Sequence, residues 1–473
     1  MATDTKAFEI GRGASAALPE VFKRFYRKRK AVIVTDSNTW DLLGASLYGK
    51  MRTAGIPTQK YIFTNKEFHA EWRYVDVMAK VIEGNCEAAK AIEEDPDYSE
   101  PDNISDAFVS AKRDSYILVA VGSGVINDIC KLSSYHHGQS YVCVPTAASV
   151  DGYSAFGASI SYHGKKENFD CPAPKAIVAD SLIIANAPKS MTAAGYADLA
   201  AKVTAGAEWM IADAVGAESI IPEAWSILQD NLDGYLSNPA GVAAGDPDAV
   251  GNLFEGLIIS GFAMQAAKSS RPASGCEHLF SHILDMTGHR YKGRLQSHGF
   301  QVAIGTLTMC AVFEELFKQD IKKIRVNRCV WAWPTLEEER RRALAVFRNF
   351  PSPDLGYEHV SEKYQNGEEV RRQLRHLKEM WPELKSSLQA QVHSFDSMRE
   401  AFKVVGAPYD PAMIGLSRTK LRDMFPIVQL MRSRFNVLDL ARQGLFYDKI
   451  VFPLFSSRGV WDLRGRFDPE KGE

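Results

Sequence analysis

The chain has 473 residues, which is too long for a single domain with one hydrophobic core, so we expect two domains. Hydrophobic residues make up 45% of it and charged residues 24%, which is typical of a soluble globular protein. The formal net charge is −2, which excludes the basic excess typical of nucleic-acid-binding proteins.

The N-terminal sequence lacks the basic flank and apolar core of a signal peptide, and no run of eighteen apolar residues predicts a membrane span. The seven cysteines are odd in number and form no CxxC pair, which argues against a disulfide framework and against a cysteine zinc site. These features predict a protein of the reducing cytoplasm.

The first part of the chain alternates short apolar runs with helical stretches. The runs of β-branched and aromatic residues lie at 31–35, 60–63, 116–121, 141–145 and 176–180. Apolar strands separated by helices are typical of a parallel sheet with helices on both faces.

After about residue 187 the sequence becomes Ala-rich, with apolar residues three and four positions apart, which predicts helices. We therefore expect an α/β domain with a parallel sheet over residues 1–187 and an all-α domain over residues 188–473. From about residue 330 onward the sequence predicts helices but no chemistry.

The run at 116–121 ends in Gly122-Ser123-Gly124, after which a helix is expected to begin. Glycines let the backbone approach a phosphate, and a helix N-terminus offers unpaired N–H groups and a positive dipole end. The pattern is not GxGxxG, and a tight turn without a ligand explains it equally well.

Two further segments each contain an acidic residue that could contact a ligand. Asp36 closes the run at 31–35, where an acid can bind a ribose diol and disfavour a 2′-phosphate, although a helix N-cap is a simpler role. The small-residue stretch 145–160 carries Asp151 as its one charged side chain. This stretch either lets a ligand approach the backbone or packs between the domains.

The sequence "SRPASGCEHLFSH" ends with two histidines four residues apart, which share one face of a helix. These are His278 and His282, and His298 follows them. Imidazole is a common ligand of zinc, nickel and iron, and a catalytic site usually has three protein ligands. The alternative is that the histidines are surface residues.

Asp198 lies within an Ala-rich apolar stretch, where an unpaired charge is costly. We therefore expect a partner for it, either a metal ion or Lys202 four residues later.

Six segments occur together, in the order "VTDSNT", "GSGVINDI", "PTAASVDGYSA", "MTAAGYADLAAKVTAGAEW", "SSRPASGCEHLFSH" and "SHGFQVAIGTL". Together they resemble the sn-glycerol-1-phosphate dehydrogenase family, within the superfamily of iron-containing alcohol dehydrogenases, glycerol dehydrogenases and dehydroquinate synthases. The resemblance covers roughly residues 30–310, and "SRPASGCEHLFSH" is its most specific part. It implies a Rossmann-like dinucleotide-binding domain and an all-α, metal- and substrate-binding domain of the dehydroquinate-synthase-like fold.

The resemblance also implies roles for individual residues. The metal ligands would be Asp198, His278 and His298, holding one divalent zinc or nickel ion, with iron also compatible. Asp198, His282 and Asp151 would form the catalytic and substrate-facing group. The cofactor contacts would be Asp36, Gly122, Ser123, Gly124, Val125, Ile126, Asn127, Asp128, Thr146, Ala147, Ala148, Ser149 and Ala155. Family members often carry a serine at the position of Ala155, where this chain has Ser154 adjacent.

The implied activity is reversible reduction of dihydroxyacetone phosphate to sn-glycerol 1-phosphate. Asp36 favours NAD as cofactor, and NADP stays compatible. A phosphorylated substrate needs cationic contacts, for which Arg271 and Lys202 are the candidates. The class commonly forms homo-oligomers, and we expect a dimer or a larger assembly.

Three alternatives stay open. The chain is a dehydrogenase of another polyol or polyol phosphate, a dehydroquinate-synthase-like lyase, or a non-catalytic binding protein on the same fold. Lyases of that kind generally carry Glu at the position of Asp198, which favours the dehydrogenase.

Overall fold

The computed structural model describes residues 4–65, 69–102, 114–163 and 165–465, which form two compact units. The first unit comprises residues 1–199 and 233–270, and the second comprises residues 200–232 and 271–473. The domain boundary near residue 187 remains a prediction, because a division by compactness need not coincide with one between evolutionary domains.

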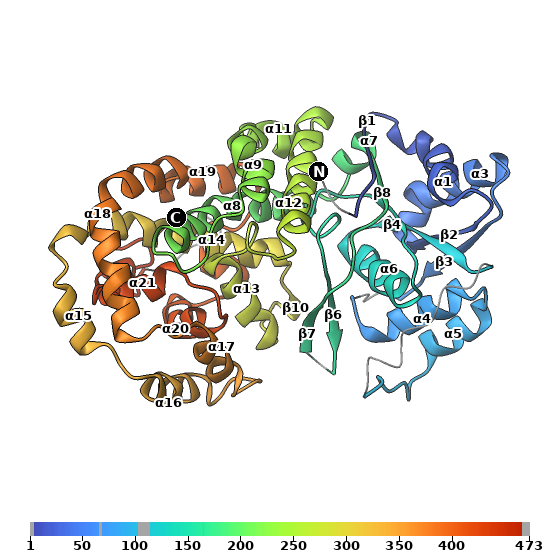
Figure 1. Ribbon diagram of the computed structural model, residues 1–473. Helices are drawn as coiled ribbons and strands as arrows, with labels where there is room; N and C mark the ends of the chain where they lie inside the picture. Colours follow the sequence, from blue (N-terminus) through green and yellow to red (C-terminus); the bar gives the residue numbers. More distant parts are fainter. Residues whose placement is uncertain (1–3, 66–68, 103–113, 164, 466–473) are drawn as a thin grey trace. The chain divides into compact units, whose positions relative to one another are not determined.

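The first unit is built on a six-stranded sheet in which every neighbouring pair of strands is parallel (Figure 1). Its strands, in the order β1-β8-β5-β4-β2-β3, are β1 Ala7–Gly11, β8 Ala176–Asp180, β5 Val142–Pro145, β4 Tyr116–Gly122, β2 Lys30–Asp36 and β3 Thr58–Phe63. The predicted parallel sheet is confirmed, and each of the five predicted runs coincides with one of its strands, except that Tyr141 lies just before β5. The edge strand β1 was not predicted.

Helices cover both faces of this sheet. Alternate strand residues point to opposite sides, and those on one side pack against α1 (Leu18–Tyr26) and α3 (Ala45–Thr53). The helices α4 (Trp72–Ile82) and α6 (Gly124–His136) pack against each other and against β4.

The strand order places a topological switch point between β2 and β4, because the chain continues from β2 to β3 on one side and to β4 and β5 on the other. Ligands of open α/β sheets bind outside the carboxyl ends of the strands at such a point. Strand β2 ends at Asp36 and β4 ends at Gly122, so both predicted cofactor motifs lie at this edge.

The first unit also contains a small antiparallel pair and several further helices. The pair is β6 Ala158–Tyr162 with β7 Lys165–Phe169. The helices are α2 Ser37–Thr39, α5 Cys86–Glu94, α7 Ser181–Ala185, α10 Leu232–Leu236, α11 Pro239–Ala244 and α12 Pro247–Ala267. The long helix α8, Lys189–Ala214, begins in the first unit and continues into the second.

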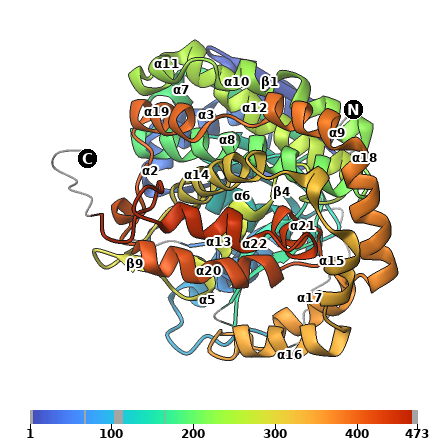
Figure 2. The same ribbon diagram turned by 90° about the vertical axis from the view of Figure 1, so that its left-hand side faces the viewer.

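The second unit is almost entirely helical, as predicted. Figure 2 shows α13 between α14 and α20, and it contacts both. Its helices after α8 are α9 Pro222–Leu228, α13 Cys276–Met286, α14 His298–Phe317, α15 Val326–Ala332, α16 Leu336–Phe347, α17 Leu355–Lys363, α18 Gly367–Gln391, α19 Phe395–Val405, α20 Arg418–Leu430, α21 Val437–Gln443 and α22 Tyr447–Val451. A short hairpin, β9 Arg290–Tyr291 with β10 Arg294–Leu295, joins α13 to α14.

Within the described ranges, α14 is the one helix whose length and apolarity would suffice to cross a membrane. Its most apolar window is 78% buried, which is the pattern of a core helix. Gly305 brings α14 close to α13, because a Cβ at that position would lie 2.1 Å from the carbonyl oxygen of Glu277.

Candidate metal centre

Asp198, His278 and His298 offer ligand atoms that all lie within 4.8 Å of one another. Asp198 stands on α8, close to the point at which this continuous helix passes from the first unit into the second. Asp198 and His278 are buried, and His298 is half-buried. One carboxylate and two imidazoles suit zinc, nickel or iron(II), so this donor set fits a divalent cation.

The orientation of His278 is fixed by the residue before it. His278 Nδ1 lies 2.8 Å from Glu277 Oε1, and the fully buried Glu277 carboxylate also accepts hydrogen bonds from Gly275 N and Thr204 Oγ1. Since a carboxylate accepts, His278 Nδ1 carries the proton and Nε2 carries the lone pair. A carboxylate–histidine pair of this kind is the usual support of a metal ligand.

His298 is oriented through a different group. Ser281 Oγ donates to Gln301 Oε1 at 2.6 Å, so its contact with His298 Nδ1 at 3.0 Å is one in which the histidine donates. His298 therefore also carries its proton on Nδ1 and its lone pair on Nε2. Both histidines thus have the tautomer that a metal ligand needs.

The carboxylate of Glu277 lies near a second buried acid. Burial acts to raise the pKa of Glu277, but the hydrogen bond and charge of His278 offset this and hold it below its ordinary value. Burial, followed by the charge of Glu277, raises the pKa of Glu208 to about 7. Glu208 accepts hydrogen bonds from the backbone of Cys276 and Val437. The negative charge beside α13 is therefore concentrated on Glu277, next to the candidate metal ligand His278.

Asp151 and Asp198 meet within the first unit. Asp151 N donates to Asp198 Oδ2 at 2.9 Å, and Asp151 Oδ2 accepts from Ser260 Oγ at 2.9 Å. Helix α8 approaches this loop closely, since a Cβ on Gly195 would lie 2.0 Å from the carbonyl oxygen of Ala148. The structure therefore holds Asp151 next to Asp198, a candidate metal ligand.

His282 follows His278 by one turn of α13, and its ring centroid lies 6.4 Å from that of His298. Arg432 Nη2 lies 3.0 Å from His282 Nε2, and Arg432 Nη1 donates to Ser274 Oγ at 2.8 Å. A guanidinium has donors only, so His282 Nε2 accepts and the neutral ring carries its proton on Nδ1. Arg432 lies in the region to which the sequence assigned no chemistry.

Close packing requires glycine at two positions of the turn between β4 and α6. A Cβ on Gly122 would lie 2.5 Å from Ile126 Cδ1, and a Cβ on Gly124 would lie 3.1 Å from Val150 Cγ2. Ser123 is the N-cap of the thirteen-residue helix α6. The turn thus presents a helix N-terminus at the switch point, where an anion is favoured.

The side chains that follow in α6 have structural partners. Ile126 is fully buried, and Asn127 accepts from Tyr141 Oη and donates to the Gly152 carbonyl. Asp128 Oδ1 accepts from Asn127 Nδ2. Contacts of Ile126 and Asn127 with a cofactor would therefore run through the backbone, at the same helix N-terminus.

Asp36 caps α2, the simpler of the two roles considered for it. Its Oδ1 accepts from Thr39 N at 2.8 Å and from Thr39 Oγ1 at 3.0 Å. In the described part of the chain no hydrogen bond is made by Oδ2, so the capping role leaves one carboxylate oxygen for a ribose.

The segment from Thr146 to Ala155 is held by buried polar contacts. Thr146 N donates to Gly122 O, and Tyr153 Oη lies 3.2 Å from Ser149 Oγ and donates to Ala147 O.

Ser154 does not take over from the absent serine. It donates to Ile258 O, and a Cβ on Gly261 would lie 2.0 Å from its Oγ, so its hydroxyl is committed to α12.

Lys131 fixes the end of the same segment, a role that the sequence did not suggest. Its fully buried ammonium donates to the carbonyls of Gly152, Ala155 and Gly157 at 2.8–2.9 Å. Asp128 lies 3.9 Å from it.

Arg271 and Lys202, the candidates for phosphate binding, are almost completely buried. Arg271 Nη2 donates to the carbonyls of Glu208 and Phe435, and its Nε lies 3.1 Å from the Glu218 carboxylate. Arg271 thus ties the segment around Phe435 to α8.

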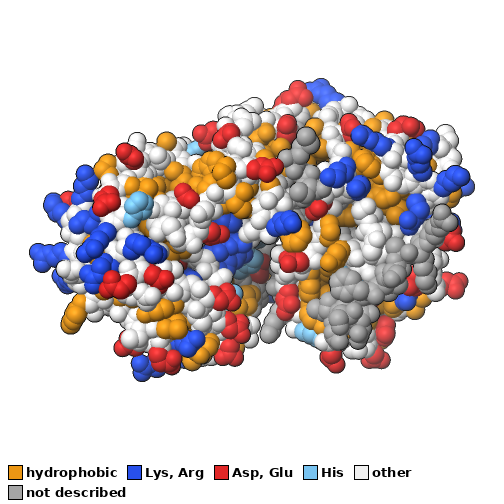
Figure 3. All heavy atoms as spheres, in the orientation of Figure 1, with side chains coloured by type: hydrophobic (Ala, Val, Ile, Leu, Met, Phe, Trp, Pro, Cys, Tyr) orange, Lys and Arg blue, Asp and Glu red, His pale blue; other side chains and the backbone are white. Residues whose placement is uncertain are grey.

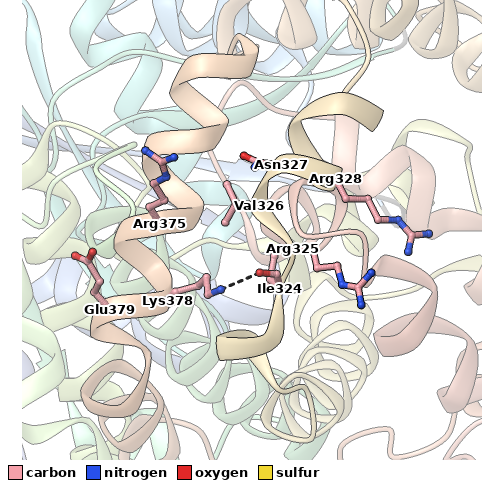
Figure 4. A pocket seen from close by; sticks show the side chains of 8 residues that line it. All are labelled: Ile324, Arg325, Val326, Asn327, Arg328, Arg375, Lys378 and Glu379. Carbon is pink, nitrogen blue, oxygen red and sulfur yellow. Dashed lines mark hydrogen bonds between the residues drawn. The ribbon is translucent and has the colours of Figure 1, made fainter.

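A basic hollow of about 760 Å³ lies on the surface of the second unit. Figure 3 shows Lys and Arg side chains gathering over the area that α15 and α18 occupy in Figure 1. Figure 4 shows Lys378, from α18, donating to Ile324 O. The hollow is lined by Ile324, Arg325, Val326, Asn327, Arg328, Arg375, Lys378 and Glu379. None of these residues belongs to the metal-ligand set.

Comparison with known proteins shows which family the chain is similar to. The sequence model of the iron-containing alcohol dehydrogenase family matches residues 73–188. A glycerol-1-phosphate dehydrogenase [NAD(P)+] of Bacillus velezensis is 31% identical over 310 residues, which cover 65% of this chain and 71% of the relative. The Pyrococcus furiosus protein of the same name is 38% identical over 191 residues, or 40% of this chain and 54% of the relative.

Solved structures agree on the fold. A probable glycerol dehydrogenase of Sinorhizobium meliloti superposes with a TM-score of 0.55 at 17% identity, covering 95% of this chain and 98% of the other. A sulfoacetaldehyde reductase of Bifidobacterium kashiwanohense, solved with NAD⁺, gives the same TM-score and coverage at 15% identity. These neighbours have the Rossmann-like and helical architecture of the iron-containing alcohol dehydrogenases. The chain belongs to the glycerol-1-phosphate dehydrogenase family within that superfamily.

Proposed function

We propose that this protein catalyses the reversible NAD(P)H-linked reduction of dihydroxyacetone phosphate to sn-glycerol 1-phosphate. The observation that carries the proposal is the cluster of Asp198, His278 and His298, with both histidines held in the metal-binding tautomer. The family membership supports the same reaction, since its curated members carry that activity in their names.

In this proposal the metal ion, the cofactor and the protein side chains have separate roles. A divalent cation on the three ligands supplies a Lewis acid that polarises a ketone carbonyl and stabilises the developing alkoxide. The nicotinamide supplies the hydride, and the Gly122–Gly124 turn and Asp36 bind the pyrophosphate and the ribose. Asp36 favours NAD over NADP. Zinc or nickel is the proposed metal, with iron also suited to the donor set.

The proton that completes the reduction would reach the alkoxide through a substrate hydroxyl or a water, with His282 or Asp151 as the proposed relay. His282 Nε2 accepts a hydrogen bond from Arg432, which holds the ring in place for this role. Asp151 lies next to Asp198 and orients the substrate hydroxyl, for which its carboxylate is an acceptor. Arg271 stays a candidate phosphate contact from the sequence, alongside its own structural partners.

Two further properties belong to this proposal. All seven cysteines are free, which supports a cytoplasmic location because structural disulfides are rare there. Family resemblance suggests a homo-oligomer, and the mass of the purified protein by light scattering tests it.

Substrate choice is tested by net consumption of NADH with a panel of ketones. The protein is chelated and reloaded separately with zinc and nickel. The expected result is metal-dependent oxidation of NADH with dihydroxyacetone phosphate, and much slower oxidation with dihydroxyacetone. Preference for an unphosphorylated ketone would favour the second candidate, a dehydrogenase of another polyol. Phosphate release without net oxidation of NADH would favour a dehydroquinate-synthase-like lyase.

A further inference from the structure

Arg432 lies beside the cluster formed by His278, His282 and His298. Its guanidinium contacts His282, which lies one helical turn from His278 and whose ring neighbours His298. It is thus separated from the metal-ligand cluster by one side chain. The phosphate of a phosphorylated ketone lies only a few bonds from the carbonyl carbon, so a phosphate-binding group belongs at about this distance from the metal.

The charge of Arg432 is not balanced by an acid of its own. Across residues 4–65, 69–102, 114–163 and 165–465, no carboxylate forms an ion pair with it. Burial lowers the pKa of Arg432 from the ordinary range; the charge of Glu277 acts against this shift, and that of Arg271 adds to it. A guanidinium that is taken out of water without a carboxylate in direct contact is costly, and an incoming dianion would stabilise it.

Arg432 is also held in place before any ligand arrives. Its Nη1 donates to Ser274 Oγ, and the segment that carries it is tied down by Arg271, which donates to Phe435 O. A cavity of about 10 Å³ lies around Arg432, Arg271 and Arg434, which is too small for a phosphate group. Arg432 is itself half-buried, and a phosphate would therefore have to reach it from outside this cavity.

We propose that Arg432 binds the phosphate dianion of the substrate and thereby selects phosphorylated over unphosphorylated ketones. This assignment rests on the proposed function. It gives the phosphate contact to the C-terminal region and leaves Arg271 with the task of positioning the segment around Phe435. The guanidinium fork matches phosphate oxygens in geometry and charge, whereas Lys presents a single point charge.

The test uses the metal-loaded full chain and the variants Arg432→Gln, Arg432→Lys and Arg271→Gln. Arg328→Gln is the matched control, because it removes the same charge from an exposed position in the basic hollow. Steady-state kinetics are measured with dihydroxyacetone phosphate and with dihydroxyacetone, together with competitive inhibition by inorganic phosphate.

Arg432→Gln is expected to lower kcat/KM for dihydroxyacetone phosphate about 10- to 100-fold, mainly through KM. The inhibition constant of inorganic phosphate should rise by a similar factor, and kcat/KM for dihydroxyacetone, which is affected only through the contact of Arg432 with His282, should fall by a clearly smaller factor. Arg432→Lys should restore part of the loss. Equal losses for both ketones, or a selective loss in Arg271→Gln with none in Arg432→Gln, would overturn the assignment.

The two proposals fail in different ways. If the wild-type protein does not reduce dihydroxyacetone phosphate, the proposed function fails. Binding of inorganic phosphate, followed calorimetrically, still reports on Arg432: loss of this binding in Arg432→Gln alone would uphold the phosphate site. Unchanged phosphate binding in Arg432→Gln would end the assignment whatever the substrate is.

Discussion

Ser281 Oγ accepts a hydrogen bond from His298 Nδ1 at 3.0 Å while it donates its own proton to Gln301 Oε1 at 2.6 Å. One hydroxyl on α13 thus sets the tautomer of His298, the candidate ligand on α14. The close approach of the two helices at Gly305 makes this contact possible, since a Cβ there would lie 2.1 Å from Glu277 O.

Ser281→Ala is therefore expected to weaken metal binding while all three ligands remain. Loss of a group that orients a metal ligand typically costs about 10- to 100-fold in affinity. Competition with a chromogenic chelator measures it. Ser226→Ala, an exposed serine in the same unit, should leave the affinity unchanged. Equal affinity in Ser281→Ala and the wild type would show that Ser281 does not support the site.

Glu208 should make stability depend on pH. Its folded-state pKa is raised from 4.5 to about 7, first by burial and then by the charge of Glu277. The folded state therefore binds this proton more tightly than the unfolded chain does, so the contribution is complete below about pH 4.5 and is lost as the pH rises through about 7.

Glu208→Gln stays neutral and should escape that loss. Denaturant midpoints are compared at pH 5, 6, 7 and 8. The difference in free energy of unfolding, variant minus wild type, is expected to grow in favour of the variant as the pH rises. A difference that is constant from pH 5 to pH 8 would contradict the assignment.

Lys131→Met tests the anchor of the loop that follows Asp151. The substitution leaves the buried carbonyls of Ala155 and Gly157 without their donor, and it leaves that of Gly152 with Asn127 as its remaining donor. We expect a loss of about 3–5 kcal/mol in the free energy of unfolding. Lys50→Met, at an exposed position of α3, should change it by less than about 0.5 kcal/mol. A similar small change in Lys131→Met would mean that the loop is held by other contacts.

Asp36→Asn separates the two roles of Asp36. Asparagine caps helices as well as aspartate does, so the stability should change by less than about 0.5 kcal/mol. Loss of the negative charge should improve use of NADPH relative to NADH by about tenfold or more, because the 2′-phosphate is no longer repelled. Rates with both cofactors measure the ratio, and an unchanged ratio would limit Asp36 to its role as the N-cap.

Much of the fold could be predicted because its signals are local. The apolar runs at β2, β4 and β8 and the Ala-rich helix α8 each carry their own periodicity. Strand β1 was missed because its five residues, AFEIG, are too short and mixed to show a pattern.

The residues of the candidate metal centre could be named from the sequence because the family motif contains His278 and is followed by His298, and the structure brings both together with Asp198. Their supporting groups could not, since Ser281 and Gln301 are ordinary residues until α13 and α14 pack together. Arg432 is 150 residues from His282, and no local pattern in "MRSRFN" points to it.

The most direct test of the central claim is calorimetric titration of zinc or nickel into the chelated full-length protein and its His298→Ala variant, with folding checked by circular dichroism. The account predicts one high-affinity ion per wild-type chain and none in the folded variant. Equal binding by the two proteins would contradict the assignment of Asp198, His278 and His298 as the metal ligands.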